Sequence, residues 1–175
     1  DLNSIQIEKG DIATPYEPYI ESNAYVAAKK DNKIVNLRSV PNGTKDEIRV
    51  SEGKLIKRVG KTVLDGTLSY SSFNITSTVM YAHIPNFLAN NNSTFSLGYY
   101  GVNSDLGEFK VYLDTHKEDG TAQLIPHNSG GLYIVIPKDK ISTPTLAGFK
   151  DYLNANPITL TYQLAEPEII PIQVS

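Results

Sequence analysis

Residues 143–164 read TPTLAGFKDYLNANPITLTYQL and contain the two patterns that decide the fold. The first half predicts one short helix over residues 144–155. Thr143 is a suitable cap, and Pro144 occupies a position where its missing N–H costs nothing. One apolar stripe follows at helical spacing, formed by Leu146, Phe149 and Leu153.

The second half predicts a strand with one buried face. Asn156-Pro157 ends the helix. Four apolar side chains then alternate with polar ones: Ile158, Leu160, Tyr162 and Leu164. Roughly ten such short strands, separated by turns, predict a mainly β fold, either an antiparallel β-sandwich or a partly closed barrel. We expect the helix to lie across one end or edge of a sheet before this last strand.

The other patterns give further expectations. They are one strand over residues 73–81, a hairpin of 46–50 with 54–59 around Gly53, partner strands at 109–113 and 121–125, and a strand at 132–136 buried on both faces. Residues 166–171 are expected to leave the sheet.

Composition excludes several classes of function. The 175 residues include no cysteine, so disulfides, thiolate metal sites and cysteine nucleophiles are excluded. A net charge of -3 argues against nucleic acid as a partner, and an apolar run of at most five residues, 132–136, argues against membrane insertion.

No catalytic constellation is visible, and we predict a protein that is not an enzyme and has no cofactor or metal. His83, His116 and His127 lack the spacing of metal ligands and are expected at loops or strand ends. Residues 129–131, Ser-Gly-Gly, lack the context of a nucleophile elbow. A hydrolase that uses the acidic residues between 105 and 119 remains an alternative.

Tyrosine-rich and asparagine-rich segments are candidate carbohydrate contacts. Sugars stack on aromatic faces and need amide and carboxylate partners. The candidate ligand-binding residues are Tyr99, Tyr100, Asn90, Asn91, Asn92, Asp105 and Glu108. The alternative is that they are loop residues of a connector domain.

The first nineteen residues differ in character from the rest. A short alternation at residues 5–8 is followed by Gly10-Asp11 and by a stretch, 14–19, that contains two prolines. We therefore expect residues 1–19 to be the end of a preceding module with a stiff linker, and residues 20–175 to form one β-sandwich-like domain. The chain begins at Asp1 without an initiator methionine, so we expect it to be a piece of a longer protein.

Three blocks resemble a known family. In order and spacing they are similar to segments of tail fibre and minor structural proteins of phages and prophages of Gram-positive bacteria. The blocks are residues 5–10 with 13–19, residues 37–48 with 58–66, and residues 149–167. The chain departs from the family pattern at residues 67–70, where Thr-Leu-Ser-Tyr replaces a segment that often contains tryptophan. Tyr70 is the aromatic residue that could substitute there.

The resemblance implies a non-enzymatic part of the distal tail of a virion, made in the bacterial cytoplasm and active outside the cell in host attachment and receptor binding. Its implied partners are a host cell-surface glycan or other tail proteins, and its implied assembly is a homo-oligomer, a trimer. The family supplies no binding residues to carry over. A free-standing carbohydrate-binding module of a secreted wall-active enzyme and a connector without a ligand are the alternatives.

Overall fold

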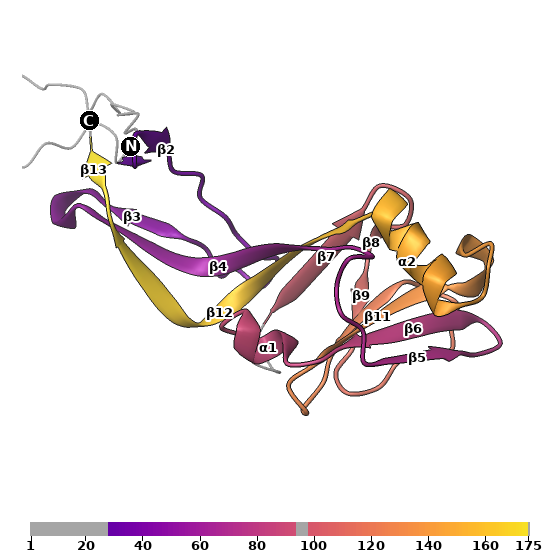
Figure 1. The fold of residues 1–175 in the computed structure, drawn as a ribbon. Coiled ribbons are helices and arrows are strands. Elements are labelled where there is room, and N and C mark those ends of the chain that lie inside the picture. Colours follow the sequence, from indigo (N-terminus) through magenta and orange to yellow (C-terminus); the bar gives the residue numbers. More distant parts are fainter. Residues whose placement is uncertain (1–27, 94–97, 175) are drawn as a thin grey trace, which may run out of the picture.

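The protein has a β-rich lobe and a narrow β arm that projects from it (Figure 1). This arrangement is seen in a computed structural model, which describes residues 28–93 and 98–174. In chain order the elements are β1 (Ala28–Lys30), β2 (Lys33–Ile34), β3 (Glu47–Arg49), η2 (Val50–Glu52), β4 (Lys54–Leu64), β5 (Ser72–Ile75), β6 (Val79–Ile84), α1 (Phe87–Asn90), β7 (Tyr99–Asn103), β8 (Gly107–Glu108), β9 (Lys110–Val111), β10 (Gln123–Pro126), β11 (Leu132–Pro137), η3 (Lys138–Lys140), α2 (Leu146–Ala155), β12 (Ile158–Pro171) and β13 (Gln173–Val174).

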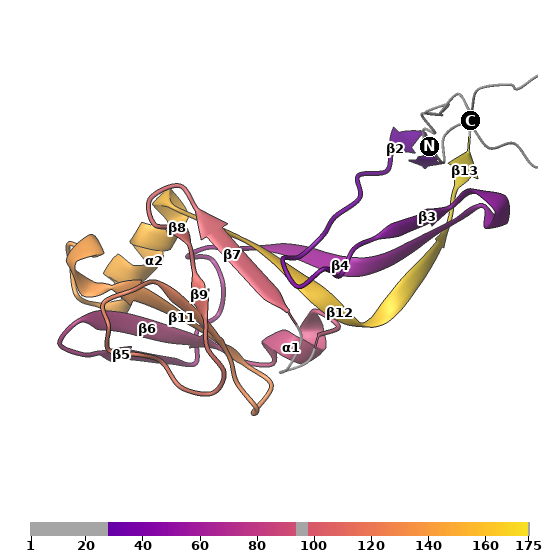
Figure 2. The same ribbon diagram turned by 180° about the vertical axis from the view of Figure 1, so that it is seen from behind.

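Two five-stranded sheets and one small sheet account for the strands. The first has the order β3-β4-β12-β7-β8 and the second the order β5-β6-β11-β10-β9. The first sheet runs through both parts of the molecule, since β4 and β12 extend from the lobe into the arm (Figures 1 and 2). At the arm tip β1 lies between β13 and β2, with Ala28 opposite Val174.

The arm contains the predicted hairpin. Strands β3 and β4 pair in antiparallel register around Gly53, which has the left-handed backbone (φ 59°) that such a connection favours. A turn precedes this hairpin at residues 41–43, as the Pro-Asn-Gly sequence there favours, with the Gly43 N–H donating to Val40 O (3.0 Å). The residues before that turn make a single bridge, Ser39 to Lys45, rather than a strand.

Strand β12 is longer than predicted. Its register with β4 is regular from Ile158 to Gln163, breaks, and resumes from Glu168 to Pro171. The expectation that residues 166–171 leave the sheet is therefore wrong, because the chain makes an irregular detour of four residues and then pairs again. Pro167 lies in this detour, where the absence of an N–H removes no ladder hydrogen bond.

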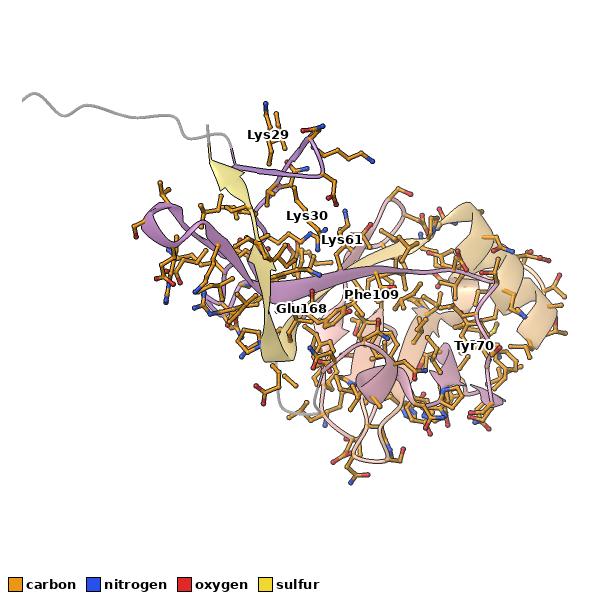
Figure 3. The ribbon with its side chains drawn as sticks, turned by 60° about the vertical axis from the view of Figure 1, so that its left-hand side comes forward. Lys29, Lys30, Lys61, Tyr70, Phe109 and Glu168 are labelled. Atoms are coloured by element: carbon orange, nitrogen blue, oxygen red, sulfur yellow. The ribbon has the colours of Figure 1, made fainter. Side chains whose placement is uncertain are left out.

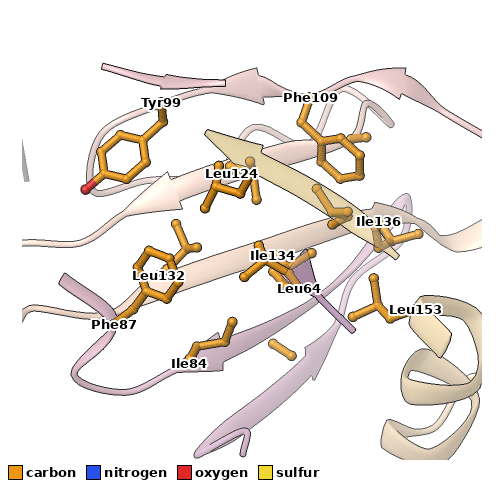
Figure 4. Close-up of a cluster of buried hydrophobic side chains, with 14 of the residues drawn as sticks. Leu64, Ile84, Phe87, Tyr99, Phe109, Leu124, Leu132, Ile134, Ile136 and Leu153 are labelled. Atoms are coloured by element: carbon orange, nitrogen blue, oxygen red, sulfur yellow. The ribbon is translucent and has the colours of Figure 1, made fainter. Parts of the chain in front are cut away.

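In the lobe the two large sheets face each other across one core. Buried side chains from β4, β7 and β12 and from β6, β10 and β11 form a single cluster (Figure 4). Leu132, Ile134 and Ile136 are fully buried there, and Val135 on the opposite face of the same strand is also buried. The mainly β, sandwich-like fold and the doubly buried strand at 132–136 are thus confirmed.

Helix α2 closes the end of the lobe that lies away from the arm (Figure 1). Phe149 and Leu153 are fully buried, as the apolar stripe predicts. The cap is Thr145 rather than Thr143, since the Thr145 hydroxyl accepts the Gly148 N–H (3.2 Å). Asn156 ends the helix directly before Pro157, and β12 follows with its predicted alternation of buried and half-buried positions.

Two strand predictions are corrected in the second sheet. Residues 73–81 form not one strand but a hairpin of β5 and β6, because the Thr76 hydroxyl accepts the Val79 N–H (3.1 Å) and the Thr76 N–H donates to Val79 O (2.9 Å). The segments 109–113 and 121–125 pair as predicted, through β9 and β10. These two strands run parallel rather than forming a hairpin. The long loop between them, residues 112–122, makes this orientation possible.

The domain boundary at residue 19 lies outside the described residues and stays a prediction. Residues 28–93 and 98–174 include no helix long and apolar enough to cross a membrane.

Candidate functional site

The predicted ligand-binding residues on β7 and β8 have two different environments. The Tyr99 ring packs in the core beside Leu124 (Figure 4) and is 8% exposed, and burial raises the pKa of its hydroxyl to about 12. It offers no face to a ligand. Tyr100 is half-buried, and its hydroxyl donates to exposed Glu108 (2.7 Å), which raises the pKa of that hydroxyl. Tyr100 and Glu108 are thus the two predicted residues that the structure brings together at a surface.

The predicted asparagines lie at the end of α1, which Asn90 closes, and directly after it, where the arm joins the lobe. Asn91 accepts the Tyr162 hydroxyl (3.1 Å), and the Asn92 amide donates to Glu166 O (3.0 Å). Both side chains therefore tie this loop to β12, whereas Asn90 is exposed.

Asp105 belongs to a third set of contacts. Its carboxylate accepts the Tyr152 hydroxyl (2.9 Å) and the Lys140 ammonium (3.3 Å). The hydrogen bond from Tyr152, followed by that from Lys140, lowers the pKa of Asp105. Its contacts link the β7–β8 turn to α2. The seven predicted residues do not form one site.

Tyr70 is also a packing residue. Its ring meets the Phe149 ring edge-on (6.0 Å between centroids), and its hydroxyl donates to Asp65 O (2.8 Å). It lies in the lobe near α2 (Figure 3).

A different cluster lies on the outer face of the second sheet. The alternation of β6 and β11 that buries Met80 and Ile134 turns Tyr81, His83 and Tyr133 outward. Antiparallel register places His83 directly opposite Tyr133. Cross-strand pairing of this kind brings side chains into contact that are fifty residues apart in the chain.

The 112–122 loop covers part of this face. The fully buried Gln123 side chain holds it, accepting the Lys117 N–H (2.8 Å) and donating to Lys117 O (2.7 Å). Glu118 accepts the hydroxyls of Thr76 (2.6 Å) and Thr78 (2.9 Å). These bonds fix the loop that carries Asp114 and His116.

Together the sheet face and the loop enclose a groove of about 150 Å³. We call it the Tyr–His groove, and its lining residues are Tyr81, Asp114, His116, Ile125, His127 and Tyr133. The His116 ring packs on Tyr81 (4.5 Å between centroids), and the His83 ring packs on Tyr133 (4.4 Å). His127 meets Tyr133 edge-on (5.6 Å). The rings support one another and form a continuous aromatic surface.

Polar groups converge on this aromatic surface. Asp114 has a left-handed backbone (φ 62°), which is uncommon outside glycine and asparagine and recurs at binding sites. Its Oδ1 accepts the Asn128 N–H (3.0 Å) and lies 3.9 Å from His127 Nε2. His127 Nδ1 accepts the Ser129 N–H (3.2 Å), so the proton of the neutral ring is on Nε2 and faces Asp114.

His83 packs on Tyr133 but does not itself line the groove. Burial, with a further contribution from His127, lowers its pKa below the usual value of 6.5. Its Nδ1 lies 2.8 Å from the Ser71 hydroxyl. Its Nε2 is buried, without a hydrogen-bond partner among the described residues. The ring is therefore neutral and supports Tyr133.

Within residues 28–93 and 98–174, Asp114, His127 and Ser129 are not placed as a catalytic triad. The Ser129 hydroxyl lies 2.7 Å from His127 Nδ1, but this nitrogen also accepts the Ser129 N–H, and Asp114 and His127 are too far apart for a hydrogen bond. Within the described ranges, no three His, Asp or Glu side chains are placed to hold a metal ion. The acids at 105, 108, 114 and 118 have separate partners.

A second hollow lies at the arm tip. It measures about 740 Å³ and is lined by residues 29–32 and 169–172. Lys29 and Lys30 stand beside it (Figure 3), and Ile169 is 64% exposed. Its wide, shallow form suits contact with another macromolecule better than capture of a small ligand.

Comparison with known proteins finds no matching family model, no matching curated protein and no matching solved structure. The functional argument therefore rests on the Tyr–His groove. Sequence spacing does not predict the groove, since its residues come from three strands and two loops. The outward-facing tyrosines in otherwise apolar strands were the available signal.

Proposed function

We propose that the chain is a non-enzymatic structural and adhesion module of a phage tail, and that its lobe contributes to host attachment by binding a cell-surface carbohydrate. The observation that carries the proposal is the Tyr–His groove. It combines aromatic faces, a carboxylate and an imidazole donor, which are the groups that protein sites use to bind sugars. The three family-like blocks of sequence supply the phage tail context.

The shape of the molecule agrees with this role. The arm holds the lobe, and with it the groove, away from the place where β1 and β13 pair (Figure 1). In this proposal the protein acts outside the cell, at the distal tail of the virion. Its partners are a wall glycan and other tail proteins.

Two tyrosine variants test the adhesion role. Full-length protein is mixed with cell-wall preparations from Gram-positive bacteria, and the fraction that pellets with the wall is measured. Tyr133→Ala removes the central ring of the groove, and we expect at least tenfold weaker binding, since a tenfold loss needs only about 1.4 kcal/mol. Tyr100→Ala is the matched control, because Tyr100 is also half-buried on a strand and lies outside the groove.

The outcomes separate the alternatives. Loss of binding in Tyr133→Ala alone supports the groove, whereas loss in Tyr100→Ala alone assigns binding to the predicted Tyr100 and Glu108 surface. If the unmodified protein binds no wall preparation, the adhesion role is wrong and the chain is a connector.

Assembly is a separate part of the proposal. The resemblance implies a trimer, and Ile34 and Ile169, 67% and 64% exposed, are apolar side chains that association through the arm would cover. Light scattering of the purified protein measures its mass directly. A monomer at all concentrations would contradict this assembly.

A further inference from the structure

We infer that the Tyr–His groove binds a single neutral pyranose ring and that Asp114 and His127 together hold one of its hydroxyl groups. This inference rests on the proposed carbohydrate-binding function and specifies the class of sugar.

The size of the groove limits the ligand to one ring. Its volume of about 150 Å³ lies below the roughly 300–1,000 Å³ of sites for drug-sized ligands. Ile125 is almost fully buried and forms an apolar floor between the aromatic walls. The groove therefore accommodates one sugar ring of a glycan rather than a longer stretch.

The separation of Asp114 and His127 fits a hydroxyl group between them. Oδ1 and Nε2 are 3.9 Å apart, too far to bond each other, but an oxygen atom can lie about 2.8 Å from both. A hydroxyl there donates to the carboxylate and accepts from the imidazole Nε2–H. Asp114 Oδ2 has no hydrogen bond within residues 28–93 and 98–174, so it is available to a second, adjacent hydroxyl.

The tyrosines provide a prearranged apolar surface for the sugar ring. Tyr81 and Tyr133 stand at 68° to each other with centroids 6.0 Å apart, and His116 and His83 pack on them from the sides. Neither tyrosine hydroxyl has a partner in the described part of the chain, so both are available to sugar oxygens. Fixed rings lose little conformational entropy on binding.

The surrounding charges disfavour an anionic sugar. Asp114 faces the ligand, and Glu118 lies on the same loop. No lysine or arginine lines the groove among the described residues, and Lys117 and Lys110 contact the Tyr112 ring (5.8 Å) and Asp119 (3.5 Å) instead. A phosphate or carboxylate in the groove would meet like charge without a compensating cation.

Side-chain NMR of the full chain tests the inference. The His127 and Tyr133 resonances are followed while methyl glycosides of neutral hexoses, N-acetylglucosamine or hexose 6-phosphates are added. We expect saturable shifts of both resonances with at least one neutral sugar and at least tenfold weaker binding of the matching phosphate.

Asp114→Asn is the variant of choice. Asparagine tolerates the left-handed backbone and keeps an oxygen for the Asn128 N–H, so the loop remains folded. Loss of the charge should weaken binding of the neutral sugar about tenfold, as expected when a hydrogen bond to a charged group becomes a neutral one. Asp151→Asn, at an exposed helix position, is the matched control and should leave binding unchanged.

Failures of the two proposals differ. Equal or tighter binding of the phosphate sugar, or an unchanged affinity in Asp114→Asn, overturns the inference. If no sugar shifts the groove resonances while Tyr133→Ala still abolishes wall binding, the ligand class is wrong and adhesion stands. If sugars bind in the groove but the protein binds to no wall preparation, the inferred sugar site stands and the proposed adhesion role is wrong.

Discussion

Asp46 provides the sharpest test of how the arm is held together. Its side chain is 5% exposed, and the carboxylate accepts three backbone N–H groups: those of Arg58 (2.8 Å), Val59 (2.9 Å) and Arg38 (3.1 Å). The first two belong to β4 where β12 makes its detour, and the third belongs to the segment before the 41–43 turn. Asp46 thus joins three segments at the base of the arm.

Asp46→Asn removes one of these bonds without changing the shape of the side chain. The amide oxygen can still accept from Arg58 and Val59, but the amide nitrogen then faces the Arg38 N–H, donor against donor. The lost bond costs about 2 kcal/mol, and the weakening of the others, once they lose the charge, costs about 1 kcal/mol more. We expect the arm to be destabilised by about 3 kcal/mol.

Amide hydrogen exchange is the appropriate assay, since the arm can open without the lobe. Exchange at Arg38, Arg58 and Val59 should accelerate by roughly two orders of magnitude, because each 1.4 kcal/mol is a factor of ten. Asp151→Asn should leave these rates unchanged, as its carboxylate is exposed on α2. Unchanged protection of all three amides in Asp46→Asn would refute the reasoning.

Further predictions concern α2 and the 112–122 loop. Gly148→Ala should lower the free energy of unfolding, measured in urea, by about 1–3 kcal/mol, because the added Cβ would lie 2.1 Å from Thr143 O. This cost should exceed the usual gain from alanine in a helix. A rise in stability would contradict the contact. Thr145→Ala should cost about 1 kcal/mol in the same assay and Thr143→Ala much less; equal costs would show that Thr145 is not the cap. The hydrogen bond from Thr76, then those from His116 and Thr78, lowers the pKa of Glu118 below its usual 4.5. Its contribution is therefore complete above about pH 4.5 and is lost as the pH falls through the lower folded value. Amide protection factors in the loop, corrected for the intrinsic exchange rate at each pH, should therefore fall on acidification, and Glu118→Gln should abolish that dependence.

The elements predicted well from the sequence are those set by local side-chain periodicity. The alternation after Pro157 fixes which face of β12 is buried, and the stripe of α2 fixes which face meets the core. Both patterns can be predicted from the sequence because they depend only on which side chains are apolar. The β5–β6 hairpin was missed because the alternation continues across it, while the turn depends on hydrogen bonds of Thr76 that periodicity does not record.

The candidate site could not be predicted in the same way. His83 approaches Tyr133 through the pairing of β6 with β11, and His116 reaches Tyr81 on a loop held by Gln123. These are relations between segments distant in the chain, on which residue spacing carries no information. Tyr99 shows the converse case. Its aromatic ring was predicted to bind a ligand at the surface, but it packs in the core.

The antiparallel pairing of β1 with β13 at the arm tip determines how the molecule responds to pulling. Tension applied at residues 28 and 174 acts on two strand ends that lie opposite each other. It therefore loads the hydrogen bonds between the strands one after another, first in β1–β13 and then in β4–β12. The pairs of β4 and β12 in the arm, from Lys54 and Pro171 onward, are loaded before the pairs that lie in the lobe. If the chain acts in host attachment as proposed, tension opens the arm before it reaches the Tyr–His groove.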